Sequence, residues 1–169
     1  MRSYQVGDVL FYPKLGPVRL VEWQQREIGG RVQLFSMWRG LDEGAGGLSH
    51  SIPMDNIDRV LRPLADKTEV EEIFGTLAEK FRPSSVGKYA PRIRAQRDKI
   101  NQGGFLDMAE IVRDLHHRRG LPRPLGLTDN ERTNLEHAMK VLSQEIGVAL
   151  GIGAAAAQKR IEKAIESGK

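Results

Sequence analysis

The spacing of apolar residues changes near Pro63, and this change divides the chain into two kinds of structure. Before it, short runs of β-branched and aromatic residues are separated by Gly and Pro, which is typical of a small antiparallel sheet. After it, apolar residues recur every three or four positions, which is typical of helices. The sequence therefore predicts an α+β protein with two domains: a β domain at residues 1–63, a linker at 64–67 and a helical domain at 68–169.

Five strands are predicted in the first domain, at residues 9–12, 18–25, 32–38, 48–52 and 58–61. Gly29 and Gly30 separate the second strand from the third, and such a pair can supply the positive φ angles of a two-residue hairpin turn. The glycine-rich residues 39–47 resemble a phosphate-binding loop in composition only, because no Lys-Ser or Lys-Thr pair follows them and no helical pattern starts there. We therefore interpret them as a connection between strands.

Five helices are predicted in the second domain, and they should pack as a compact bundle. Two of them begin with a capping box, in which a Thr and a Glu three residues later cap each other's backbone. The boxes are Thr68 with Glu71 and Thr128 with Glu131. The first helix should extend to Phe81 because its apolar residues share one face that far. The other helices are expected at residues 89–102, 105–119, 128–150 and 154–166.

The chain of 169 residues carries a net charge of +4, but its positive charge is concentrated in residues 80–99. This segment holds seven Lys or Arg and one acid, Asp98, so it carries +6 while the rest of the chain carries −2. A local basic cluster with an aromatic residue inside it is typical of a nucleic-acid surface. A solvated helix face would have the same composition, and the charges alone leave both interpretations open.

The predicted helix at residues 89–102 has Tyr89 at its start. The first turn of a helix offers backbone N–H groups and a positive dipole end to a phosphate. The ring of Tyr89 could pack as a core staple or could project and stack on an exposed base, and the residues alone favour the staple. The candidate DNA-binding residues are Tyr89, Lys88, Arg92, Arg94, Arg97 and Lys99.

Groups for catalysis or metal binding are sparse in this sequence. There is no cysteine, and the adjacent His116 and His117 would point about 100° apart on a helix, so they cannot share one metal ion. Asp107, Glu110 and Asp114 could hold a cation, but we expect them to pair with arginines of the same helix. No dinucleotide, phosphate-loop, zinc-protease or hydrolase motif occurs. The sequence predicts no catalytic residue, no metal and no cofactor.

Several short motifs occur together in an order and spacing known from one family. They are Val6-Gly7-Asp8, Tyr12-Pro13 with Gly16, Ile28-Gly29-Gly30, Ile52-Pro53 and the stretch Met-Ala-Glu-Ile-Val-Arg-Asp-Leu at residues 108–115. The last closely matches an Ala-Glu-Val-Val-Arg-Asp-Leu helix of that family. In order, spacing and length the chain resembles the CarD/CdnL family of bacterial RNA-polymerase-binding transcription regulators, whose N-terminal module is shared with transcription-repair coupling factors.

The resemblance implies a Tudor-like N-terminal module that binds the β subunit of RNA polymerase. It also implies a helical domain that contacts promoter DNA at the upstream edge of the melted bubble. Family members typically place a Trp wedge at the start of the second helix of that domain, where this chain has Tyr89, and Arg94 falls at a DNA-contacting basic position. Arg26 and Ser51 fall at two positions where relatives use basic residues to contact polymerase, so Ser51 departs from the family pattern, as does Pro91 in place of an Arg.

We therefore expect a non-enzymatic transcription regulator that binds RNA polymerase and stabilises the open promoter complex, with phosphate contacts and little base readout. The alternative is a polymerase-binding adaptor that has lost the DNA wedge and acts through protein–protein contacts. The sequence has no apolar signal-peptide run and no stretch close to the roughly 18 apolar residues of a membrane span. We expect a monomeric cytoplasmic protein that joins the nucleoid through RNA polymerase and has no membrane partner.

Overall fold

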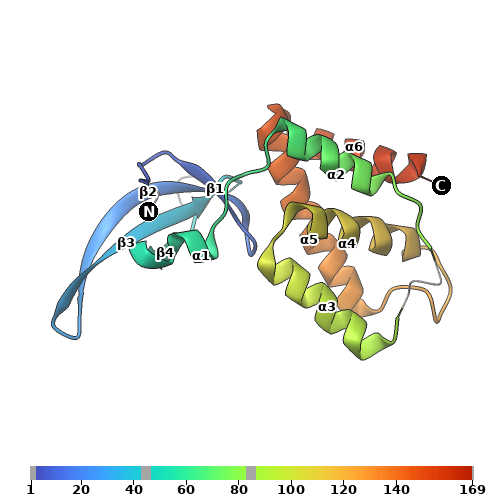
Figure 1. The fold of residues 1–169 in the computed structure, drawn as a ribbon, viewed down its shortest axis with the longest axis horizontal. Helices are drawn as coiled ribbons and strands as arrows, with labels where there is room; N and C mark the ends of the chain where they lie inside the picture. The colour runs from blue at the N-terminus through green and yellow to red at the C-terminus, as the bar shows by residue number, and fades with distance from the viewer. Residues whose placement is uncertain (1–2, 43–46, 83–86, 169) are drawn as a thin grey trace. The chain divides into compact units, whose positions relative to one another are not determined.

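The computed structural model describes residues 3–42, 47–82 and 87–168. Contacts divide the chain into two compact units, Met1–Leu64 and Ala65–Lys169. In Figure 1 the first unit contains the blue and cyan strands, and the second contains the green to red helices. The predicted α+β class, with an antiparallel β part followed by a helical part, is confirmed. The centre of the predicted glycine-rich connection, residues 43–46, lies outside the described residues.

The first unit is built on one antiparallel sheet with the strand order β1-β2-β3-β4. The strands are β1 Val9–Tyr12, β2 Gly16–Ile28, β3 Arg31–Gly40 and β4 His50–Pro53. Gly29 and Gly30 form the turn between β2 and β3 with φ angles of 59° and 74°, the backbone that a primed hairpin turn requires. The predicted hairpin is confirmed, and so are the first four of the five predicted strands.

The core of the first unit surrounds Trp38 of β3, which is fully buried. Its indole N–H donates to the Ser36 hydroxyl at 2.7 Å, and that hydroxyl donates to the Ile52 carbonyl oxygen at 2.9 Å. Both buried polar groups are thus satisfied, as a stable interior requires. The buried apolar residues of this core are Leu10, Val18, Leu20, Trp38, Ile52, Ile57 and Leu61.

The prediction of a fifth strand at residues 58–61 is wrong. A 3-10 helix, η1 Met54–Asn56, leads into the short helix α1 Ile57–Val60. Ile57 and Leu61, four residues apart, both reach the core of the sheet from this turn, and burying both apolar side chains favours helical over extended backbone. Strand-like pairing is limited to Arg62, which forms an isolated bridge with Phe11 of β1.

The second unit contains five helices, as predicted, among its described residues. They are α2 Lys67–Leu77, α3 Tyr89–Gln102, α4 Phe105–Arg118, α5 Asp129–Leu150 and α6 Ala154–Ser167. The long helix α5 contacts α2, α3, α4 and α6. Its apolar stripe, which includes Leu135, Leu142 and Ile146, is buried in this core.

The first helix of this unit differs from the prediction at both ends. Helix α2 is capped by Asp66, which forms a capping box with Glu69, so the box does not start at Thr68. The helix can begin earlier than predicted for two reasons. The Ala65 N–H donates to the Glu145 carboxylate at 2.8 Å, which fixes the backbone just before Asp66. Asp is also as good an N-cap residue as Thr. The helix ends at Leu77, before Phe81. The predicted capping box at Thr128 is confirmed.

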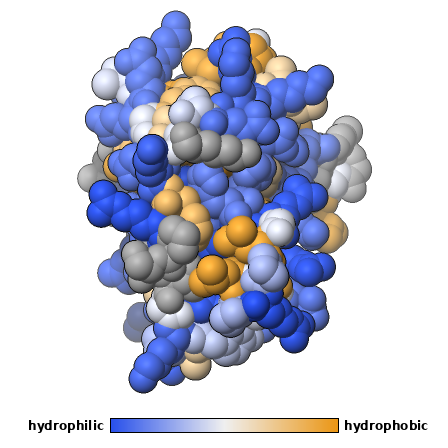
Figure 2. All heavy atoms as spheres, turned by 90° about the vertical axis from the view of Figure 1, so that its right-hand side faces the viewer, coloured by the Kyte–Doolittle hydropathy of each residue, from blue (hydrophilic) through white to orange (hydrophobic). Residues whose placement is uncertain are grey.

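Figure 2 shows one face of the molecule, on which hydrophilic side chains surround small hydrophobic patches. Among the described residues of the helical unit, the large apolar side chains that are more than a third exposed are Tyr89, Leu106, Leu121 and Val148. In the described part of the chain, no helix combines the length and the apolar composition needed to cross a membrane.

Candidate nucleic-acid interface

Helix α3 begins at Tyr89 without a capping side chain. Lys88 occupies the N-cap position with extended backbone, and its side chain makes no capping hydrogen bond. The first turn contains no acidic residue. Pro91, which has no N–H, fits in this turn. The start of α3 therefore presents the positive end of the helix dipole, and it lacks the carboxylate that would commonly neutralise it.

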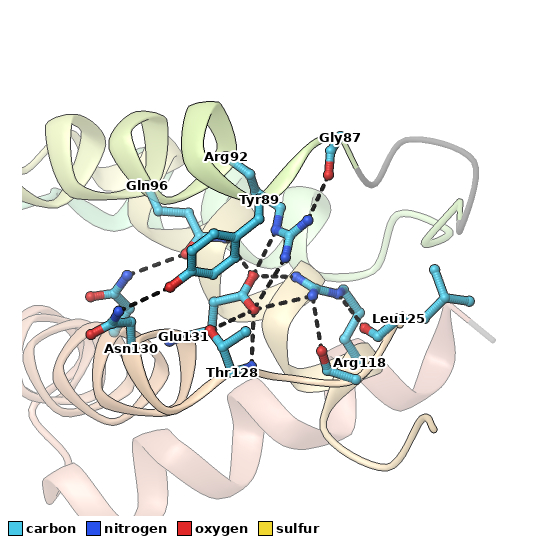
Figure 3. Close-up of polar contacts among 11 residues, drawn as sticks. Gly87, Tyr89, Arg92, Gln96, Arg118, Leu125, Thr128, Asn130 and Glu131 are labelled. Atoms are coloured by element: carbon cyan, nitrogen blue, oxygen red, sulfur yellow. Dashed lines mark hydrogen bonds and ion pairs between the residues drawn. The ribbon is translucent and has the colours of Figure 1, made fainter. Parts of the chain in front are cut away.

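A buried carboxylate, that of Glu131 in the first turn of α5, joins three helices (Figure 3). Its Oε1 accepts hydrogen bonds from Arg118 of α4 at 2.6 Å and from Arg92 and Gln96 of α3 at 2.9 and 3.2 Å. Its Oε2 accepts from the backbone N–H and the hydroxyl of Thr128, both at 3.1 Å. One carboxylate thus fixes the start of α3 and the end of α4 against the start of α5.

The charge on Glu131 is strongly stabilised. Burial alone would raise its pKa, but the hydrogen bonds from Arg118, Arg92, Thr128 and Gln96 outweigh burial and lower the pKa to about 2. Glu131 is therefore ionised at any physiological pH. It compensates the guanidinium charges that would otherwise be buried alone.

Arg118 is the buried partner of this carboxylate, with 2% of its side chain exposed. Its Nε donates to the Leu125 carbonyl oxygen at 2.7 Å, and a terminal nitrogen donates to the Gly126 carbonyl oxygen at 3.2 Å. The pair with Glu131 was not predicted from the sequence, although a signal exists. Arg118 lies three residues after the buried Leu115, on the apolar face of α4, and a charge on a buried face needs a partner.

Tyr89 lies at the start of α3 with 48% of the residue exposed. Its hydroxyl accepts a hydrogen bond from Asn130 Nδ2 of α5 at 3.1 Å, and the guanidinium carbon of Arg92 is 5.8 Å from its ring centroid. The interpretation of Tyr89 as a core staple is wrong, because about half of it is in solvent. An exposed ring with a partnered hydroxyl is suited to stacking.

Two of the predicted DNA-binding cations are engaged in ion pairs inside the unit. The Arg92 side chain is 16% exposed, and besides its pair with the buried carboxylate it donates to the Gly87 carbonyl oxygen at 2.6 Å. Lys99 pairs with Asp107 at 3.3 Å and with Glu110. Burial would lower the pKa of Lys99, but its hydrogen bonds to Glu110 and Asp107 raise it. These two cations hold α3 against α5 and α4.

The other predicted cations, Lys88, Arg94 and Arg97, are exposed. None of the three forms an ion pair with another residue in the described ranges. Arg94 and Arg97 are three residues apart and share one side of α3. The structure thus places Tyr89 and these three cations at the surface, and their contact with DNA stays a prediction.

The predicted polymerase-binding residues, Arg26 of β2 and Ser51 of β4, lie on one face of the sheet. The strand register puts Ser51 opposite Met37 of β3, and an Arg26 terminal nitrogen is 3.6 Å from the Met37 sulfur. The Arg26 guanidinium also lies 5.1 Å from the centroid of the Phe35 ring. Because side chains alternate along a strand, this Arg26–Ser51 face is opposite the face that buries Trp38. Its contact with polymerase stays a prediction.

A separate hollow of about 730 Å³ lies between α4, α5 and α6. Apolar side chains such as Leu135 and Met139 and charged ones such as Arg132 and Glu136 both line it. It contains none of the predicted site residues. In the described part of the chain, no group of three or more His, Asp or Glu could hold a metal ion. Of the acids considered for a cation site, Asp114 pairs with Arg113 of its own helix at 2.8 Å, as expected. The expected pairing with arginines of the same helix is wrong for Asp107 and Glu110, which pair with Lys99 of α3.

Comparison with known families agrees with the resemblance noted in the sequence. Residues 72–162 match the family model described as the CarD C-terminal domain. This span includes all of α3, α4 and α5, and with them Tyr89, Glu131 and their contacts. The matched residues make up more than half of the chain. The chain therefore belongs to the CarD family of transcription-related proteins.

Proposed function

We propose that this CarD family member binds RNA polymerase through its β module and stabilises the open promoter complex through contacts between α3 and DNA at the upstream edge of the bubble. The observation that supports the proposal is the start of α3. There, the half-exposed ring of Tyr89 follows Lys88 at an uncapped, positive helix end.

The ring of Tyr89 can act as the wedge. A base that stacks on an exposed aromatic ring gains about 1–3 kcal/mol. Bases inside a duplex stack on both of their neighbours, so a face free for such stacking occurs at the melted fork and not within the duplex. The protein then binds the melted fork more tightly than the duplex, and it shifts the promoter toward the open state by that difference in binding free energy.

The exposed cations of α3 supply affinity for the DNA backbone. Lys88 lies beside the helix end, where backbone N–H groups favour a phosphate, and Arg94 and Arg97 extend the charge along the helix. Phosphate contacts are independent of sequence and weaken with salt. Arg92 and Lys99 support this surface through their ion pairs with acids of α5 and α4.

The Arg26–Ser51 face is the proposed contact with the polymerase β subunit. Docking there would hold α3 near the promoter and raise its effective concentration at the fork. Binding to isolated DNA should therefore be weak, and the effect of Tyr89 should appear in complexes that contain polymerase.

The test is the lifetime of open promoter complexes with wild-type protein, Tyr89→Ala and Leu106→Ala. Leu106 is a matched control, because it is an exposed apolar residue of the same unit, 38% exposed at the start of α4. Loss of one stacked base should shorten the lifetime by about 5- to 140-fold for Tyr89→Ala. Leu106→Ala should behave as wild type. Equal lifetimes for all three proteins would refute the proposal.

The second candidate is an adaptor that binds polymerase without a DNA wedge. It is favoured by the ion pairs of Arg92 and Lys99, which leave fewer cations of α3 for phosphates. In that case Tyr89→Ala would leave open complexes unchanged, while Arg26→Ala would abolish the effect of the protein on transcription. The two functions are separated by comparing these variants on one promoter.

A further inference from the structure

We propose that Asn130 is a positioning residue for the wedge, and that its hydrogen bond to the Tyr89 hydroxyl allows a tyrosine to serve at this position. The inference rests on the proposed function of Tyr89. Asn130 belongs to a different helix, and its proposed role is to act through the tyrosine and not through its own contact with DNA.

The contact itself spans two helices. Asn130 Nδ2 in the first turn of α5 donates to the Tyr89 hydroxyl oxygen in the first turn of α3 at 3.1 Å, although the two residues are 41 positions apart in the chain (Figure 3). Both residues are exposed. No core surrounds the ring, and the Arg92 guanidinium, 5.8 Å from its centroid, covers a face of the ring without fixing the direction of its hydroxyl. The bond to Asn130 fixes the hydroxyl end of the ring and, with Arg92, selects one direction for the side chain.

The two helical turns that carry Tyr89 and Asn130 are held together by the same carboxylate, that of Glu131. Asn130 precedes Glu131, whose side chain is held by Arg118 and by the Thr128 cap. Tyr89 is three residues before Arg92, which bonds to Glu131 at 2.9 Å. The Tyr89–Asn130 bond therefore joins two points whose backbones are already fixed. A bond between fixed points costs little further entropy and sets the ring before DNA arrives.

The hydroxyl is the feature that distinguishes this wedge from an indole or a phenyl ring. A phenyl ring has the same stacking face but offers Asn130 nothing to bond to. The hydroxyl must find a partner if stacking excludes water from it, and Asn130 supplies that partner from the side of the ring that faces α5. The tyrosine ring is thereby held in place by its hydroxyl. A Trp at this position has no hydroxyl, so it could not accept this hydrogen bond from Asn130.

The experiment is a double-mutant cycle on open-complex lifetime, measured with polymerase, promoter and the full-length protein. The variants are Asn130→Ala, Tyr89→Phe, both together, and Tyr89→Ala for reference. Asn134→Ala is the matched control, because Asn134 Nδ2 on the same helix donates to Gln96 Oε1 of α3 at 3.2 Å without touching Tyr89. Thermal unfolding of Asn130→Ala and Asn134→Ala is compared in parallel.

We expect Asn130→Ala and Tyr89→Phe each to shorten the lifetime by about 2- to 10-fold, the effect of losing one hydrogen bond. The double variant should be no worse than either single one, since both remove the same contact. Asn134→Ala should leave the lifetime unchanged while its thermal unfolding matches that of Asn130→Ala.

Three outcomes would overturn the inference. A longer lifetime for Asn130→Ala would mean that the hydrogen bond disfavours the ring orientation that stacks on the base. An equal loss from Asn130→Ala in the wild-type and Tyr89→Phe backgrounds would mean that Asn130 acts without the hydroxyl. An unchanged lifetime for Asn130→Ala would remove the role entirely. If Tyr89→Ala shortens the lifetime in the same series, the proposed function survives; if Tyr89→Ala also has no effect, both proposals fail.

Discussion

At the scale of single residues, Glu131 has two structural roles. It completes the capping box of α5 with Thr128, and it compensates the charges of Arg92 and Arg118. The first role links it to its own helix and the second to α3 and α4. The start of α3, where Tyr89 lies, is thus held by a residue 42 positions away from it in the sequence. The position of the candidate wedge depends on this carboxylate more than on packing around α3.

Replacing Glu131 by Gln should strongly destabilise the protein. Arg118 would keep its buried charge without a counter-charge, and breaking a buried ion pair in this way costs about 3–5 kcal/mol. The free energy of unfolding from urea titrations measures the effect. Glu110→Gln is the control, because Glu110 is a partly exposed carboxylate that pairs with Lys99, and its loss should cost less than about 1 kcal/mol. Similar losses for the two variants would contradict the role assigned to Glu131.

The pH dependence of stability should carry the signature of the same group. In the unfolded chain the pKa of Glu131 is about 4.3, whereas in the folded protein it is about 2. As the pH falls the unfolded chain takes up this proton first, so the stability from Glu131 is complete above about pH 5 and is lost between about pH 4.3 and pH 2. Between pH 5 and pH 3, wild type should lose more unfolding free energy than Glu131→Gln. Parallel curves would exclude the low pKa.

The residues of the candidate site were predictable to different degrees. Gly87, Pro91 and the apolar spacing predict that Tyr89 lies at a helix start. They do not predict that Tyr89 is exposed, because periodicity cannot show which neighbours cover a helix end. Arg92 and Arg94 are equivalent as charges in a sequence. Only the folded chain shows that Arg92 meets Glu131 while Arg94 is exposed, since this contact joins residues 39 positions apart.

At the scale of elements, α3 is the least apolar helix of the second unit. Ile93 is its one buried residue in the described structure. Polar contacts from Tyr89, Arg92 and Gln96 hold it to α5, and Lys99 holds it to α4. A helix attached in this way can leave one whole side to solvent and charge, as a phosphate-binding surface needs.

The charges of α3 should differ in their effect on DNA binding. Arg94→Gln and Arg97→Gln should each reduce the slope of log affinity against log salt by about 0.9, because each removes one phosphate contact. Lys99→Gln should change the slope less, since Lys99 pairs with Asp107 and Glu110. Fork-DNA binding at several salt concentrations, with polymerase present, measures the slopes. Equal changes for the three variants would mean that the ion pairs of Lys99 do not decide which charges reach DNA.

Elements with strong local signals were predicted well, and the exceptions have physical causes. Helices α3 to α6 follow from apolar spacing, from the Thr128 cap and from glycines such as Gly103, which ends α3 with φ 68°. Residues 58–61 are too few to distinguish a strand from a turn of helix by periodicity. The helical turn α1 forms there because it lets Ile57 and Leu61 both reach the core of the sheet. At α2, Asp66 and Thr68 both precede a Glu by three residues, so the cap was ambiguous.

At the scale of the whole molecule, two units are joined by a very short connection. Arg62 is hydrogen-bonded to Phe11 through both backbone groups, at 2.7 and 3.1 Å, and Ala65 is anchored to Glu145. Only Pro63 and Leu64 lie between these anchors. If the first unit binds polymerase and the second binds DNA, as proposed, this short connection would keep both contacts on one promoter.

Arg26→Ala should weaken polymerase binding by at least about 5-fold, as expected for an interface arginine that contributes more than about 1 kcal/mol. Binding of polymerase to labelled protein is the measurement. Lys14→Ala is the control, since Lys14 is an exposed cation of the same unit in the turn between β1 and β2. Fork contacts of Tyr89 should persist once Arg26→Ala is driven onto polymerase at high concentration. Wild-type affinity in Arg26→Ala would place the docking surface elsewhere.

A fluorescent base analogue can show whether Tyr89 stacks on a base at the upstream edge of the bubble. The analogue is placed at successive positions across that edge in promoter complexes with polymerase, and its emission is compared for wild-type protein and Tyr89→Ala. We expect one position at the fork whose fluorescence changes with wild type and not with Tyr89→Ala, because stacking on an aromatic ring alters the emission. Identical profiles for the two proteins at every position would contradict it.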